Sequence, residues 1–451
     1  MEMLQTLASF VVALGVLVAV HEFGHYWVAR RLGVKILRFS LGFGRPLWRR
    51  QGAETEFVVA AIPLGGYVKM LDEREGEVPP DELPRAFNRQ PLATRAAVVV
   101  AGPLANFLLA FLAYWLTLVI GVTGPQPLVG AVRSDSIAAA GGLTAGDRIL
   151  AVDEVATATW DGVFRRGLDA ILDGGELILR VRGEEGGERF ATLDFSALGI
   201  DDISEGDFLE ELGITPVRPQ VPPVIERVVP GEPAARAGLR SGDRVLSAEG
   251  APVATWFDWV DVVRAHPARP LAIEVERGGT RIAMTLTPAA EQVDGETVGR
   301  IGAEVRVPES IEPVPVARER YGALEALGGA AERTWSMSIT TLRFLGKMIM
   351  GEASVRNLSG PISIAQFAGD SARLGVARFL EFLALVSVSL GVLNLLPIPL
   401  LDGGHLLYYL IEFVARRPVS ETIQVYGQQI GLVVLLGLMG LAVYNDILRI
   451  L

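Results

Sequence analysis

The sequence contains no cysteine among its 451 residues and only four histidines. Without cysteine, the chain can form no disulfide bridge, thiol nucleophile or thiolate metal site. Any metal site must therefore be built from histidine and carboxylate side chains. Excess positive charge is also missing, since the net charge is −11, and this argues against nucleic acid as a partner.

Long apolar runs are abundant, and half of the residues are hydrophobic. This pattern predicts a polytopic α-helical membrane protein in the lipid bilayer, with substantial soluble parts. We expect transmembrane helices at residues 1–30, 96–122, 376–402 and 429–448. The first of them has neither a basic region before it nor a small-residue cleavage site, so we interpret it as a retained anchor rather than a signal peptide.

The first apolar segment contains His21-Glu22-Phe23-Gly24-His25. On a helix, residues four apart share a face, so His21 and His25 can offer ring nitrogens to one Zn²⁺ with Glu22 beside them as a general base. Each ionisable group at membrane depth costs about 2.5–3.5 kcal/mol. A metal site is therefore favoured over the alternative, a buried polar cluster that ties helices together.

The third predicted span supplies a candidate third ligand. It contains Asn394, Pro397 and Pro399 and ends at Asp402. The two prolines and the Gly-Gly pair that follows predict a broken helix, and a lone aspartate at that depth is costly unless it is paired or bound to metal. We expect Asp402 to complete the zinc site, with a fourth position open for water.

His405 competes with Asp402 for this role, or else lies exposed at the start of a predicted cytoplasmic segment at residues 403–428. His266 is excluded, because the predicted topology puts it on the opposite side of the membrane. Asn394 is expected to hold the substrate backbone or the developing oxyanion, with the segment around Pro397 and Pro399 unwound for substrate binding.

The loop at residues 31–95 is rich in arginine and lysine. The positive-inside rule therefore places it, and the nearby metal motif, toward the cytoplasm. Two β-rich stretches, Ile36–Gly44 and Thr55–Met70, predict a membrane-associated hairpin whose bends contain Gly42, Gly44, Gly65 and Gly66. An edge strand here could pair with an unwound substrate, or the hairpin could be a plain surface feature.

Between the second and third spans the composition changes to soluble α/β sequence and repeats itself. Ser136–Asp153 and Glu232–Gly250 each contain a short helix, a Gly-Leu turn and Gly-Asp-Arg before a strand. Both copies resemble the bacterial PDZ pattern, which predicts inserted PDZ domains at residues 123–221 and 222–308, followed by amphipathic helices at residues 309–375. The strands Leu128–Val132 and Val224–Val229 could bind peptides by strand addition, or the domains could act as spacers or size filters.

The chain as a whole resembles the site-2 protease family of intramembrane zinc metalloproteases, of the sigma-E-regulating type. The segments that carry the resemblance are His21–His25, Gly42–Gly44, Pro63–Met70, Ala101–Asn106, the tandem PDZ copies, Ser359–Ile364 and Asn394–His405. The resemblance implies zinc at His21, His25 and Asp402 and catalysis by Glu22.

The resemblance also implies a location in the bacterial inner membrane with periplasmic PDZ domains. The implied substrates are single-span proteins, namely an anti-sigma factor already trimmed on its periplasmic side and remnant signal peptides. The implied role of the PDZ pair is to exclude substrates that keep a bulky periplasmic domain. The rival hypothesis is a membrane-anchored PDZ scaffold or chaperone whose metal site is structural; such a site is usually closed by four protein ligands and needs no adjacent glutamate.

Overall fold

The computed structural model describes residues 2–74, 76–173, 175–196, 208–293, 296–306, 313–351 and 358–450. The chain forms two units. Met1–Thr123 and Arg318–Leu451 make up the first, here called the helical unit, and Gly124–Leu198 and Asp202–Ala317 make up the second, the sheet unit. Strands β3 (Val122–Pro125) and β18 (Val316–Glu319) lie where the chain leaves and re-enters the helical unit. The domain boundary predicted at Pro308 falls outside the described residues.

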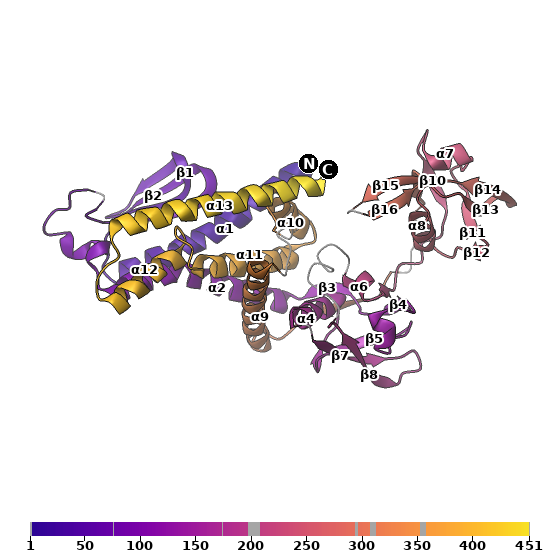
Figure 1. The fold of residues 1–451 in the computed structure, drawn as a ribbon, viewed down its shortest axis with the longest axis horizontal. Coiled ribbons are helices and arrows are strands. Elements are labelled where there is room, and N and C mark those ends of the chain that lie inside the picture. Colours follow the sequence, from indigo (N-terminus) through magenta and orange to yellow (C-terminus); the bar gives the residue numbers. More distant parts are fainter. Residues whose placement is uncertain are drawn as a thin grey trace. The chain divides into compact units, whose positions relative to one another are not determined.

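Four helices of the helical unit are long and apolar enough to cross a membrane, among the residues that the structure describes. They are α1 (Glu2–Arg31), α2 (Leu92–Ile120), α11 (Val376–Leu395) and α13 (Glu421–Ile450). In the helical unit of Figure 1, α2 packs against both α1 and α11. Large apolar side chains of α13 stay exposed, with Val433 at 71% and Leu436 at 56%, as expected for a helix covered by lipid.

Three further helices pack on these spans: α9 (Glu325–Met350), α10 (Pro361–Arg373) and α12 (Asp402–Ala415). The buried alanines Ala326 and Ala330 bring α9 close to α2 and α11. Helix α10 lies against α1, α11 and α13. The sequence analysis predicted amphipathic helices at residues 309–375, and in the structure α9 and α10 both pack on the spanning helices. Helix α12 occupies the first part of the segment 403–428, for which the sequence analysis predicted no helix.

The N-terminus of α10 is held by a buried carboxylate from α13. Asp446 is 1% exposed, and its side chain accepts hydrogen bonds from the backbone N–H groups of Gly360 at 2.9 Å and Ile362 at 2.8 Å. It also accepts from both the backbone N–H, at 3.1 Å, and the hydroxyl, at 2.6 Å, of Ser363. An aspartate at a helix N-terminus satisfies backbone donors that have no partner within the helix.

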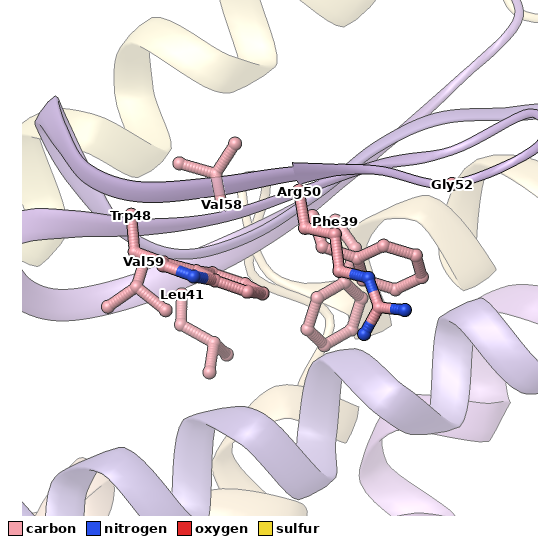
Figure 2. Close-up of a pocket in the computed structure, with 8 residues that line it drawn as sticks. Phe39, Leu41, Trp48, Arg50, Gly52, Val58 and Val59 are labelled. Atoms are coloured by element: carbon pink, nitrogen blue, oxygen red, sulfur yellow. The ribbon is translucent and has the colours of Figure 1, made fainter.

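The predicted hairpin is confirmed as β1 (Ile36–Gln51) paired with β2 (Glu56–Met70). Its register shows that it curls, because Phe39 lies opposite both Phe57 and Val68. The first part of β1 is thus enclosed between two parts of β2, and the run from Gly66 to Lys69 lies at an edge. One face of the curled sheet lines a largely apolar, partly open cavity of about 390 Å³ (Figure 2). Two 3₁₀ turns, η1 (Leu83–Arg85) and η2 (Phe87–Arg89), follow the hairpin.

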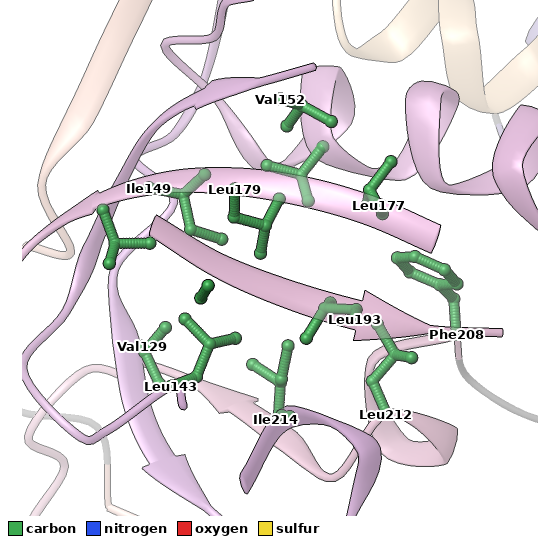
Figure 3. Packing of buried hydrophobic residues seen from close by; sticks show 14 of the residues in the cluster. Val129, Leu143, Ile149, Val152, Leu177, Leu179, Leu193, Phe208, Leu212 and Ile214 are labelled. Carbon is green, nitrogen blue, oxygen red and sulfur yellow. The ribbon is translucent and has the colours of Figure 1, made fainter. Parts of the chain in front are cut away.

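The sheet unit contains two copies of one topology. The first has a four-stranded sheet in the order β6-β5-β7-β8, a separate β4-β9 pair and three helices. These elements are β4 (Val129–Val132), α3 (Ile137–Ala140), β5 (Arg148–Val152), β6 (Val155–Ala156), α4 (Trp160–Asp173), β7 (Glu176–Arg182), β8 (Glu188–Asp194), α6 (Phe208–Glu211) and β9 (Ile214–Pro216). Figure 3 shows the core of this copy, where Ile149, Leu177 and Leu179 are fully buried.

The second copy repeats the arrangement with a sheet in the order β12-β11-β13-β14 and a separate β10-β17 pair. Its elements are β10 (Ile225–Val228), α7 (Pro233–Ala237), β11 (Arg244–Ala248), β12 (Ala251–Pro252), α8 (Trp256–Arg264), β13 (Leu271–Arg277), β14 (Thr280–Leu286), β15 (Ala289–Val293), β16 (Glu296–Arg300) and β17 (Ala303–Val305). Corresponding glycines before the repeated aspartates, Gly146 and Gly242, have positive φ values of 86° and 90°. The sequence repeat therefore corresponds to a structural repeat.

The repeated aspartates are buried and ion-paired in the same way. The pairs are Asp147 with Arg189 at 2.6 Å and Asp243 with Arg277 at 2.7 Å. Burial raises the pKa of each aspartate, but the hydrogen bonds from the guanidinium and from a backbone N–H outweigh it, so each pKa lies below its usual value. Each carboxylate thus anchors the turn that precedes its sheet.

Candidate metal centre

The histidine motif lies on one face of α1, as its spacing predicts. The long apolar run without proline keeps this helix continuous from Glu2 to Arg31. The Nε2 atoms of His21 and His25 are 3.2 Å apart. Glu22 lies beside them and interacts electrostatically with both imidazoles.

Two glycines bring α2 against this face. A side-chain carbon on Gly24 of α1 would lie 2.3 Å from the carbonyl oxygen of Ala101. On the facing helix, a side-chain carbon on Gly102 would lie 2.3 Å from Nε2 of His25. Small residues at such a crossing allow membrane helices to approach closely. Both glycines are therefore required by the geometry of the histidine pair.

The close approach lets α2 hold the second nitrogen of each imidazole. Nδ1 of His25 lies 2.8 Å from the carbonyl oxygen of Val98. Because a carbonyl oxygen can only accept a hydrogen bond, Nδ1 carries the proton, and the lone pair of Nε2 faces the cluster. Nδ1 of His21 lies 3.1 Å from the side-chain amide of Asn106. Asn106 is completely buried. The α2 helix thus fixes the orientation of both rings.

Asp402 approaches from the other side, at the first position of α12. The helix break predicted by the two prolines lies between Leu395, where α11 ends, and Asp402. Within it, Leu400 has a positive φ of 86°, a strained conformation for a branched side chain. Gly403 and Gly404 pack directly on the backbone of the break, where a side chain on Gly403 would lie 2.1 Å from the carbonyl oxygen of Leu396. The break and its glycines therefore aim the carboxylate at the histidines.

The three side chains form a compact donor set that could hold a metal ion. Oδ2 of Asp402 lies 3.3 Å from Nε2 of His21 and 3.4 Å from Nε2 of His25. Ligand atoms 2.0–2.1 Å from a tetrahedral zinc are about 3.3–3.4 Å apart, which is the spacing found here. Oδ2 is buried and has no hydrogen-bond partner among the described residues. The residues present fit zinc, with one ligand position left for water.

The glycines of the hairpin differ in what they contact. A side-chain carbon on Gly66 would lie 2.9 Å from Cγ of Glu22 and 2.9 Å from Val18, so this edge of the sheet lies against α1 at the motif. Gly65 has φ 112° and faces the ring of Phe43. Gly42 and Gly44 have φ values of 89° and 85° and form the bend of β1 opposite Ile62. Gly66 is thus the hairpin glycine that contacts the histidine motif directly.

The other predicted site residues lie around the helix break. Asn394 is 9% exposed on the last turn of α11, and in the described part of the chain its amide makes no hydrogen bond. Pro397 lies within the break, and the carbonyl of Pro399 contacts Gly431 of α13. His405 is one turn further along α12, near the ring of Tyr408, and is not part of the donor set. His266 binds the carbonyl oxygen of Val262 within α8.

The sequence analysis missed the strained Leu400 and the contact between Gly66 and Glu22. Leucine carries no sequence signal for positive φ, and a contact between two distant segments follows from tertiary packing. The sequence also gave no sign that Gly102 makes room for the ring of His25.

Comparison with known proteins decides the class of this site. The family model of peptidase family M50 matches residues 9–438. This chain belongs to peptidase family M50. The M50 chain is 46% identical over 445 residues to the regulator of sigma-E protease RseP of Escherichia coli K12, with 98% of each protein covered.

It is also 44% identical to the regulator of sigma E protease of Salmonella typhimurium LT2, with 100% of each covered. A candidate zinc metalloprotease of Neisseria meningitidis serogroup A is 42% identical, with 99% of this chain and 100% of that protein covered. The PDZ domain of an SdrC-like protein from Listeria monocytogenes matches 20% of this chain and 93% of that domain at 20% identity, with a TM-score of 0.17, which is too low to decide a fold. This M50 chain is a zinc metalloprotease of the intramembrane, site-2 protease type.

Proposed function

We propose that His21, His25 and Asp402 bind the zinc, and that Glu22 is the catalytic base of an enzyme that cleaves single-span membrane proteins within the bilayer. The observation that carries the proposal is the 3.2–3.4 Å spacing of the three donor atoms, which matches a tetrahedral zinc with one free position. When bound, zinc lowers the pKa of a coordinated water toward ~7 and polarises a peptide carbonyl.

Glu22 then performs the proton transfers. Its carboxylate takes a proton from the attacking water, whose oxygen becomes bonded to the carbonyl carbon of the substrate. As the carbon–nitrogen bond breaks, Glu22 delivers that proton to the leaving nitrogen, and the products are a carboxylate and an amine. Asn394 donates its unpaired amide to the substrate backbone or to the oxyanion as charge develops there.

The substrate must be unwound before it is cut, because a helix in lipid keeps its peptide groups hydrogen-bonded. Among the described residues, the hairpin edge from Gly66 to Val68 pairs with the first part of β1 on one side only, and Gly66 lies against Glu22. A substrate segment added to this edge would be extended beside the catalytic base. Pro397 and Pro399 keep the opposing wall non-helical, since neither can donate a backbone hydrogen bond.

We further propose that the two repeats of the sheet unit are periplasmic PDZ domains and that the metal centre faces the cytoplasmic side of a bacterial inner membrane. The basic loop at residues 31–95 supports this orientation. The relatives named as regulators of sigma-E protease suggest an anti-sigma factor as substrate, and remnant signal peptides are a second substrate class of the same chemistry.

A scaffold with a structural metal site fits the arrangement less well. A structural zinc is normally closed by four protein ligands, whereas the donor set contains three. The discriminating experiment uses purified protein with the substitution Glu22→Gln. We expect zinc content to remain while cleavage of a trimmed single-span substrate falls at least 10²-fold. Undiminished cleavage by this variant would refute the assignment of Glu22.

A further inference from the structure

The basic residues that follow α1 are of two kinds. Most of them are paired with carboxylates. The paired residues are Lys35 with Glu82, Arg38 with Glu56, Arg74 with Asp72, Arg85 with Glu54, Arg89 with Glu73 and Arg95 with Glu412. Among the described residues of this segment, Arg45, Arg49 and Arg50 have exposed guanidinium groups and no carboxylate partner.

The three unpaired arginines lie together on the second half of β1, interleaved with exposed apolar side chains. Leu47 is 71% exposed and Trp48 is 52% exposed. Tryptophan and arginine side by side are typical of the interface between lipid and water, where the ring contacts acyl chains and the cation meets headgroups. This half of β1 therefore has the composition of a membrane-surface segment.

The same half of β1 forms one wall of the hairpin cavity. Because side chains alternate along a strand, Trp48 and Arg50 point to the same face, and both line the cavity (Figure 2). The remaining lining side chains are apolar, namely those of Phe39, Leu41, Phe57 and Val59, and the backbone of Gly52 and Val58 completes the wall. At about 390 Å³ the cavity has the size of a small-ligand site. An apolar cavity with one cation at its rim suits an amphiphile with a negative head.

We propose that this cavity binds one anionic phospholipid, with an acyl chain along the apolar face formed by Trp48 and Val59 and the phosphate on the guanidinium of Arg50. The inference rests on the proposed position of the hairpin at the membrane surface. A lipid is favoured over a peptide because the cavity wall is apolar and its cation has no partner within the chain.

The cavity is linked to the metal centre through aromatic contacts. The rings of Phe39 and Phe57 lie 5.6 Å and 5.8 Å from the ring of Tyr26, which directly follows His25 on α1. Aromatic pairs at such distances attract one another beyond the effect of their buried area, so these rings hold the hairpin to α1. A lipid that fills the cavity would stabilise this packing.

The test uses the purified full-length protein in neutral detergent, with added phosphatidylglycerol, phosphatidylcholine or inorganic phosphate. Native mass spectrometry counts bound lipid, and thermal unfolding reports stabilisation. We expect selective retention of one phosphatidylglycerol and a higher Tm with it alone. Each cation near an anionic lipid contributes about fivefold in affinity, so Arg50→Gln should weaken binding by about fivefold.

The matched control, Arg89→Gln, removes the same charge from a paired residue of the same segment and should bind lipid as the natural protein does. A second variant, Val59→Trp, fills the cavity and keeps the charges, and it should also lose the lipid. Equal retention of phosphatidylcholine, equal stabilisation by inorganic phosphate, or undiminished lipid binding by the Arg50→Gln variant would overturn the proposal. The proposal would also be overturned if the Arg50→Gln variant bound lipid as the natural protein does but no longer bound a single-span substrate. Because lipid is read by mass, failure here is distinct from failure of the protease assignment.

Discussion

The orientation of two imidazoles determines whether the donor set can bind metal. His25 is fixed by the carbonyl oxygen of Val98, and His21 is next to the amide of Asn106. A metal on Nε2 requires the proton to be on Nδ1, so the group beside Nδ1 must accept a hydrogen bond. Oδ1 of Asn106 is buried without a partner among the described residues and can take this role when the amide rotates.

We predict that Asn106→Leu weakens zinc binding by about 10–100-fold, because the ring of His21 loses its acceptor. Asn106→Asp keeps an acceptor and should restore most of the affinity. The measurement is a zinc competition titration against a chelator. The control is Thr117→Val on the same helix, since Thr117 bonds only backbone carbonyls away from the motif. Natural affinity in the leucine variant would show that Asn106 does not position His21.

The sequence could predict the donor residues but not the details that position them. The spacing of His21 and His25 requires only helix geometry, and the cost of a lone carboxylate in lipid pointed to Asp402. The choice between Asp402 and His405 needed the structure, because they are only three residues apart on α12 and only Asp402 joins the histidines in the donor set. The strain at Leu400 has no counterpart in residue preferences.

Among the elements, α10 depends on α13 for its N-terminus. Four hydrogen bonds converge on the buried carboxylate of Asp446. Helix α10 in turn packs on α1, where Ala368 is buried with Ala13 and Leu17. Asp446 therefore ties the last span to the helix that contains the histidines.

We predict that Asp446→Asn destabilises this junction by about 2–3 kcal/mol, because hydrogen bonds to a charged acceptor are replaced by fewer and weaker ones. Hydrogen exchange of the amides from Gly360 to Ser363 should become faster. The control is Asp370→Asn, which changes an exposed ion pair on the same helix and should have little effect. Unchanged exchange in the Asp446 variant would contradict a capping role.

The sheet unit should be sensitive to acid through its two buried aspartates. The folded pKa values of Asp147 and Asp243 lie below their unfolded values, so their contribution to stability is complete above about pH 4 and is lost as the pH falls through the folded pKa. We expect the contribution of these groups to the Tm of the unit to be constant between pH 5 and 8, and the Tm to fall below about pH 4. In the double variant Asp147→Asn with Asp243→Asn, the Tm should fall less steeply as the pH drops below about 4. The same fall in Tm as in the natural protein would disprove the linkage.

Elements that depend on local sequence patterns could be predicted, whereas those that depend on contacts between distant residues could not. The Gly-Asp-Arg repeat and the long apolar helices are local patterns, and the structure contains both. The curl of the hairpin depends on register, since Phe39 faces two distant residues of β2. The partners of α9 and α10 could not be derived from an amphipathic pattern, because the pattern shows that one face is apolar but not what covers it.

For the whole molecule, the sheet unit is an insertion whose two connections to the helical unit lie close together. The backbone N–H of Tyr321 donates to the carbonyl of Leu118 at 3.0 Å, and Arg318 donates to the carbonyl of Ile120 at 2.6 Å. The helical unit contains the complete donor set. A deletion of residues 124–317 closed by a short linker should therefore preserve the metal centre.

We predict that this deletion variant binds zinc and cleaves single-span substrates whether or not their periplasmic domain has been removed, because the proposed filter is gone. The full-length chain should cleave only the trimmed form. Cleavage of matched trimmed and untrimmed substrates by the purified proteins measures this. The deletion combined with Glu22→Gln provides the inactive control. A zinc-loaded deletion variant that cleaves neither substrate would contradict a role limited to exclusion.

The most direct test of the account is the zinc content of purified single variants, measured by elemental analysis. His21→Ala, His25→Ala and Asp402→Asn should each lose the metal, whereas Glu22→Gln and His405→Ala should keep about one zinc per chain. Full zinc occupancy in the Asp402 variant, or loss of zinc on replacing His405 alone, would contradict the proposed ligand set.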